Sequence, residues 1–171
     1  MAIADTDIEY RLSGGVSNTD PNASIGGAIS TLSGGLIVSG NPENLFDATS
    51  GDEAAAGDVE YRCFFIKNKH ATLTWISPKV WVKTASSSAD VAFALGLASE
   101  GVGGTPSAIA NESTAPSGVT FTTPTTKAGG LSVADVPAGS SVGVWVRRTV
   151  TAGAAAADVT VTVRAEGDSN P

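Results

Sequence analysis

SVGVWVRR, residues 141–148, places valine at every second position, and this alternation decides how the chain is expected to fold. Successive side chains of a β-strand point to opposite faces, so the valines fall on one face and Trp145 and Arg147 on the other. The segment DVTVTVRA, residues 158–165, repeats the alternation. The pattern is typical of an antiparallel sheet with one face buried.

Shorter stretches of the same kind recur along the chain, separated by turn-rich segments such as SGNPEN and TAPSG. They predict an all-β fold, an antiparallel β-sandwich or jelly-roll-like domain. Only DEAAA (52–56) and SAIANE (107–112) have the composition of short helices. Further strands are expected at Ile8–Leu12, Gly35–Val38, Glu60–Lys67, Ala71–Ile76, Lys79–Lys83, Val91–Leu97, Val119–Thr122 and Gly130–Val133.

The N-terminal third of the chain has a different composition. Residues 1–50 are rich in glycine, serine and asparagine and contain few apolar residues. We expect an extended N-terminal arm or long loops there, with one or two strands, and a β-sandwich domain over residues 51–171. An arm with few apolar contacts of its own is expected to order against a neighbouring subunit.

The charge of the chain excludes some classes of partner. Its 171 residues carry a net charge of −7, which argues against binding to nucleic acid or to an anionic membrane surface. Residues 1–60 hold ten acids and one base, whereas residues 61–83 hold five bases and no acid. Solvated strand faces are the simplest explanation of this asymmetry, which could also align two copies or fit a partner of mixed charge. The start of the sequence lacks the features of a signal peptide, and one cysteine cannot form an intrachain disulfide. We therefore expect folding in a cytoplasm.

The stretch SGDEAAAGDVEYRCFFIKNKH, residues 50–70, contains the components of an active site: four acids, the one cysteine and the one histidine. Alternation places Cys63 on the apolar face of a strand, as a small core residue, and His70 falls at an expected hairpin tip. The acids fit no calcium-loop spacing, although an ion at the turn near Asp52 remains open. We predict no enzyme activity, catalytic residue, cofactor or metal; an enzyme using Cys63 and His70 is the least favoured hypothesis.

Aromatic side chains suggest a contact surface instead. Trp81 and Trp145 lie opposite the valines of their strands, and Phe64 lies opposite Cys63. Exposed aromatics on a sheet are typical of protein or carbohydrate contacts, although a second sheet or the N-terminal segment could also cover them. The sequence changes from acidic to basic between Glu60 and Arg62, close to Phe64, and we add these two charged residues to the predicted surface. The predicted protein-contact surface comprises Glu60, Arg62, Phe64, Trp81 and Trp145.

Phrase-like stretches over nearly the whole chain give it a resemblance to a known group of proteins. They are ADTDIEYRLSGGVSNTDPNASIGGAIS (4–30), NLFDATSGDEAAAGDVEYRCFFIKN (44–68), KVWV (79–82), ALGLASEGVGGTPSAIANESTAPSGVTF (94–121) and VPAGSSVGVWVRR (136–148). The chain resembles small virion structural proteins of tailed bacteriophages, most of all capsid decoration or cement proteins.

The resemblance implies a β-rich protein without enzyme activity. It would bind the outside of a mature phage head, assembled in the cytoplasm of the host bacterium. There it would hold neighbouring capsomers together, with the major capsid protein as its partner and a dimer or trimer as its own state. The alternative is a carbohydrate- or receptor-binding β-sandwich module of a phage tail or fibre, for which Trp81 and Trp145 are the motive.

Overall fold

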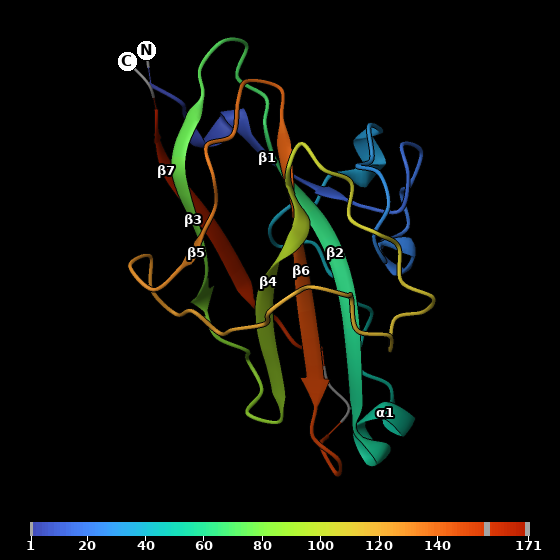
Figure 1. The fold of residues 1–171 in the computed structure, drawn as a ribbon. Helices are drawn as coiled ribbons and strands as arrows, with labels where there is room; N and C mark the ends of the chain where they lie inside the picture. Colours follow the sequence, from blue (N-terminus) through green and yellow to red (C-terminus); the bar gives the residue numbers. More distant parts are fainter. Residues whose placement is uncertain (1, 156–157, 170–171) are drawn as a thin grey trace.

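Two antiparallel sheets pack face to face in the computed structural model, which describes residues 2–155 and 158–169 (Figure 1). One sheet has the order β1-β2-β6-β4 and the other the order β5-β3-β7. The predicted all-β sandwich is therefore confirmed. The strands are β1 (Ile8–Leu12), β2 (Asp58–Asn68), β3 (Trp75–Thr84), β4 (Val91–Val102), β5 (Leu131–Ser132), β6 (Ser141–Val150) and β7 (Thr162–Ser169).

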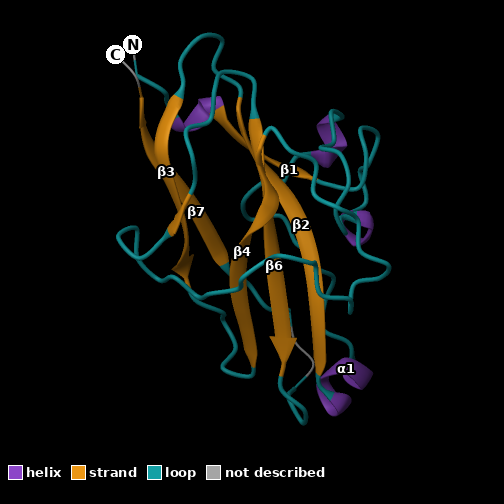
Figure 2. Ribbon diagram, in the orientation of Figure 1, coloured by secondary structure: helices purple, strands orange, loops and turns teal. Residues whose placement is uncertain are grey.

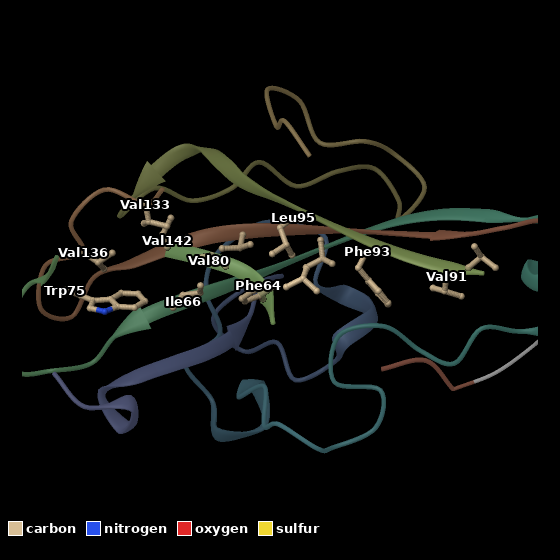
Figure 3. Close-up of a cluster of buried hydrophobic side chains, with 14 residues drawn as sticks. Phe64, Ile66, Trp75, Val80, Val91, Phe93, Leu95, Val133, Val136 and Val142 are labelled. Carbon is tan, nitrogen blue, oxygen red and sulfur yellow. The ribbon is translucent and has the colours of Figure 1, made fainter. Parts of the chain in front are cut away.

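The hydrophobic core lies between the two sheets and follows from the alternation in the sequence. On β2 and β6, Phe64 is paired in register with Val144, and both side chains point toward the three-stranded sheet. That sheet contributes Val80 and Val82 of β3 to the same core. Figure 3 shows Phe64 and Val142 from one sheet and Val80 from the other among the side chains of this core. Other buried members are Ile66, Trp75, Val91, Phe93, Leu95, Val133, Val136, Val142, Val146 and Val150.

The segment between β2 and β3 crosses from one sheet to the other. β2 pairs with β1 and β6, whereas β3 pairs with β5 and β7, so these consecutive strands do not form a hairpin. The prediction of a hairpin tip at His70 was wrong for this reason. The His70 Nδ1 instead accepts hydrogen bonds from the backbone N–H groups of Thr72 and Leu73, which shapes the crossover.

Long loops cover the outer face of the four-stranded sheet (Figure 2). We call residues 13–30 and 103–123 the loop layer. Its two halves are joined by hydrogen bonds from Gly27 N–H to the Pro106 carbonyl (2.7 Å) and from Ile109 N–H to the Ile25 carbonyl (3.0 Å). Figure 1 shows the connector from β4 toward β5, coloured yellow to orange, crossing β2, β6 and β4. Both faces of the four-stranded sheet are thus covered by protein.

Glycines let the loop layer rest directly on the strands. A Cβ atom at Gly143 would collide with the ring of Pro106, and one at Gly96 would collide with the Val119 side chain. Glycine within a strand is typical of such a close approach. The loop layer is therefore seated on the backbone of β4 and β6.

The N-terminal segment contributes one strand to the sandwich. β1 pairs antiparallel with β2, with Tyr10 opposite Ile66. The rest of residues 2–50 forms loops with three short 3₁₀ turns, Asp5–Asp7, Pro21–Ala23 and Ser33–Gly35. The pairing of β1 with β2 ends at Leu12 and Phe64. The next residue of β2 toward its start, Cys63, donates its backbone N–H to the carbonyl of Ser24 in the loop layer (2.7 Å).

The α-helix α1 (Gly51–Ala56) matches the predicted helix at DEAAA. Ser50 caps its N-terminus, and the Glu53 side chain accepts a hydrogen bond from the Ser50 N–H in return, which forms a capping box. Gly57 ends the helix at a φ of 78°. Among the described residues, no helix has the length and apolar character needed to cross a membrane.

Several predicted elements were wrong, because a short apolar run can pack as a loop without joining a strand ladder. The segments at 35–38 and 119–122 make only isolated bridges, Arg11 to Leu36 and Leu95 to Thr122. The SAIANE segment is part of the loop layer and is not helical. The strand expected at Ala71–Ile76 begins only at Trp75.

Candidate functional site

The five residues of the predicted contact surface are all buried. None of Glu60, Arg62, Phe64, Trp81 and Trp145 is more than 7% exposed. The expectation that the aromatic side chains point into solvent was therefore wrong. Phe64, with Glu60 and Arg62 on the same face of β2, points toward the three-stranded sheet. The loop layer buries Trp145 and turns the outer face of the four-stranded sheet into a second interior.

Phe64 and Cys63 lie on opposite faces of β2, as alternation predicts, but the face expected to be exposed is the one that faces the other sheet. Phe64 points into the space between the sheets, where its ring lies 6.0 Å from that of Tyr10. Cys63 points to the opposite face and is buried beneath the loop layer with Trp145 and Ala98. The prediction that Cys63 is a buried core residue is confirmed, but its core is the smaller outer one.

Trp145 is the centre of this outer core. It is paired in register with Cys63 of β2, and the cluster that it forms with Cys63 and Ala98 is packed against apolar side chains of the loop layer, among them Val119 and Phe121. Trp81 lies on the face of β3 opposite Val80 and Val82 and is also buried. Neither tryptophan offers a ring face to a ligand in this structure.

Glu60, Arg62 and Arg148 form a buried ionic cluster at one end of the interior. The Arg148 Nε donates to the Glu60 carboxylate (2.5 Å), and the Arg62 Nη2 lies 3.6 Å from it. Arg148 also donates to the Asp47 backbone carbonyl (2.6 Å), and Arg62 donates to the Glu112 carboxylate (2.5 Å). The cluster therefore ties β2 and β6 to both a residue before α1 and a residue of the loop layer.

A single aromatic ring completes the cluster. The guanidinium carbons of Arg148 and Arg62 lie 5.0 and 5.6 Å from the centre of the Phe46 ring, within the range of cation–π contact. Burial raises the pKa of Glu60, and the charges of Arg148 and Arg62 oppose that rise. These contacts hold the strands and the neighbouring loops together. Each buried charge of the cluster is compensated by the others, so the loss of one leaves an unpaired buried charge.

Three carboxylates come together where α1 meets β2. Oxygens of Glu53, Asp58 and Glu60 lie within 4.8 Å of one another. The sequence leaves open an ion at the turn near Asp52, and Asp52 is not in this group. Glu60 is already neutralised by Arg148, and Glu53 caps α1. These structural roles account for the positions of Glu53 and Glu60.

Cys63 and His70 are not brought together as a catalytic pair. Burial raises the pKa of the Cys63 thiol, which disfavours the thiolate that a nucleophile needs. The His70 ring hydrogen-bonds within its own crossover segment. The two side chains have separate structural roles.

The carboxylates of Glu9 and Glu100 bind neighbouring segments through hydrogen bonds, and the free energy of unfolding should therefore fall at acidic pH. Burial would raise the pKa of Glu9, but hydrogen bonds from Arg11 and Lys69 lower it below its ordinary 4.5. For Glu100, burial is likewise outweighed by hydrogen bonds from the N–H and hydroxyl of Ser107. A lowered pKa stabilises the fold above the unfolded pKa, and this stability is lost as the pH falls through the folded pKa.

We predict that the thermal midpoint falls as the pH is lowered from about 6 to about 3, and that the fall is smaller in a Glu9→Gln, Glu100→Gln double variant. Scanning calorimetry across the pH series measures both. Lys69→Gln keeps both carboxyls but removes one of the two cations that lower the pKa of Glu9, so its pH profile should lie between those of the parent and the double variant. Identical pH profiles for the double variant and the parent would contradict the assignment.

Two of the exposed apolar side chains lie in loops that the sequence analysis did not single out. Val16 is 57% exposed and Leu32 is 45% exposed. Thr31 N–H donates to the Val16 carbonyl (2.9 Å), and Arg11 Nη1 donates to the carbonyls of Ser30 and Leu32 (both 3.2 Å). The backbone under these side chains is therefore held in place. We call Val16 and Leu32 the apolar tip.

The apolar tip had no periodic signal in the sequence. Val16 follows the first copy of LSGG (12–15), and Leu32 begins the second (32–35). This repeated tetrapeptide is the one feature that could have drawn attention to the two residues.

Comparison of the chain with profiles of known protein families, with characterised proteins and with solved structures finds no match.

Proposed function

We propose that the chain is a non-enzymatic virion structural protein of a tailed bacteriophage. It binds the outside of the mature head and cements neighbouring capsomers, and its partner is the major capsid protein. The phrase-like stretches of the sequence support the phage assignment. The protein itself associates as a dimer or trimer in this proposal, which light scattering after size-exclusion chromatography tests.

The apolar tip is the observation that carries the proposal. Val16 and Leu32 expose apolar surface on loops whose backbone is hydrogen-bonded to β1 and its neighbours. A preorganised apolar contact loses little conformational entropy on binding, which favours a protein partner with a complementary surface. Many copies on one shell would add their contacts together, so a modest single contact suffices for stable attachment.

A protein that binds only the mature shell stabilises it by mass action. This passive mechanism requires a rigid, well-fastened domain and no reactive group. The buried ionic cluster and the loop layer supply that rigidity, since they join loops before α1 and after β4 to the strands.

Charge at the apolar tip should abolish attachment without unfolding the protein. We predict that a Val16→Asp, Leu32→Asp variant binds purified heads lacking the protein at least about tenfold more weakly, because a carboxylate must be desolvated in the interface. Co-sedimentation with the heads measures the binding. Val38→Asp, at another exposed apolar position, is the matched control. Undiminished binding of the double variant would contradict the role of the tip.

The carbohydrate- or receptor-binding alternative loses its motive. It rested on exposed Trp81 and Trp145, and both are buried.

A further inference from the structure

A half-open apolar cavity lies where β1, the start of β7 and residues 37–46 meet. Its volume is about 190 Å³. Aliphatic and aromatic side chains make up most of its wall, and the exposed Ser39 and Thr162 are among its few polar residues. The apolar wall includes Tyr10, Ile37, Leu45, Phe46, Val161 and Val163.

A second cavity continues from the first along β7. The two share Tyr10, Ser39, Thr162 and Val163, so they adjoin, and the second is more polar, with a volume of about 340 Å³. Its wall includes Lys83 and Arg164, together with one acid, Asp5.

The charges of the second cavity are not equally engaged. Arg164 pairs with Glu166 and lies 3.9 Å from Asp5, so its charge is compensated. Lys83 is exposed and makes no ion pair with any residue that the structure describes. An uncompensated cation beside an apolar cavity complements a ligand that joins a hydrocarbon part to an anionic group.

We propose that these adjoining cavities bind an anionic amphiphile, an unbranched alkyl carboxylate, with its chain in the apolar cavity and its carboxylate at Lys83. Apolar cavities of about 150 Å³ stay dry and take up small hydrocarbons, so the first cavity is large enough for a short alkyl chain. The carboxylate replaces part of its hydration by a charge-assisted hydrogen bond from the Lys83 ammonium. This inference is independent of the proposed role on the phage head.

The chain length of the ligand gives the first test. Methyl resonances of Ile37, Leu45, Val161 and Val163 are followed by carbon–proton NMR during titration with sodium butyrate, hexanoate and octanoate. We expect these resonances to shift and the affinity to rise about fourfold per added methylene until the cavity is full. No shift at these methyls, or shifts of equal size over the whole surface, would overturn the proposal.

Three variants distinguish binding of the ligand's alkyl chain in the apolar cavity from binding of its carboxylate at Lys83. Val161→Trp fills the apolar cavity and should weaken octanoate binding at least about tenfold, whereas Val59→Trp, at an exposed site outside both cavities, should leave it unchanged. Lys83→Gln is a surface substitution that keeps the fold; it should weaken octanoate about three- to tenfold at low salt and leave the binding of neutral 1-octanol unchanged. Equal affinity of the parent for octanoate and 1-octanol, or full octanoate affinity in Val161→Trp, would overturn the assignment.

Discussion

Arg148→Met is expected to lower the free energy of unfolding by about 3–5 kcal/mol, because it leaves the buried Glu60 carboxylate without its main partner. Arg62 remains 3.6 Å from that carboxylate, but it is already bonded to Glu112. The loss also frees the Asp47 carbonyl, which Arg148 holds before α1. Urea unfolding followed by tryptophan fluorescence measures the change.

A matched pair of variants shows whether burial is the cause. Arg164→Met removes a half-exposed arginine from its pair with Glu166 and should cost less than about 1 kcal/mol. Glu60→Leu added to Arg148→Met should not reduce stability further, because it removes the uncompensated charge. If Arg148→Met cost no more than Arg164→Met, the ionic cluster would not fasten the fold.

Trp145→Ala is expected to cost about 3–5 kcal/mol, since it empties the centre of the outer core. The effect should also be local. The loop layer lies on Trp145, and the Tyr61 N–H donates to the Glu112 carbonyl of that layer (2.7 Å), so hydrogen exchange at Tyr61 should accelerate in the variant.

The control for this variant is Val38→Ala, which changes an exposed side chain and should alter stability by less than about 0.5 kcal/mol. Trp145→Phe keeps most of the buried volume and should fall between the two. A loss below about 1 kcal/mol for Trp145→Ala would mean that the loop layer does not depend on this side chain.

The strands with strict alternation were predictable from the sequence. β1 was predicted with its observed ends, and β2 and β6 were predicted within two residues. β4 continues past its predicted end at Leu97 to Val102, and β3 is one strand where two, at 71–76 and 79–83, were predicted. The valines of β3 and β6 repeat at every second residue, and burial of that face against a second sheet is the simplest outcome. Pairing between distant strands is not encoded in local alternation, so the crossover at His70 was missed.

The faces of the four-stranded sheet could not be assigned from alternation. Each strand shows two sets of side chains, and alternation predicts one buried set and one exposed set. Here the loop layer buries the second set, including Trp145 and Cys63. The sequence holds one hint of this, because Gly96 and Gly143 lie within strands where side chains would block the loops.

The ionic cluster was only partly visible in the sequence. Glu60 and Arg62 lie on the same strand face as Phe64, and alternation places Cys63 on the opposite face. The sequence therefore predicted two charged residues on the face away from Cys63. Their partner Arg148 comes from β6, and pairing across 88 residues depends on the register of two strands. Sequence reasoning therefore found two of the three residues and gave them the wrong environment.

The central claim is the proposal that the chain is a phage head protein, and electron cryomicroscopy of purified virions tests it most directly. The account predicts density for the two-sheet domain on the outer surface of the head, at joints between capsomers, with the apolar tip of Val16 and Leu32 against the major capsid protein. Density confined to the tail, or virions that lack the protein altogether, would contradict it.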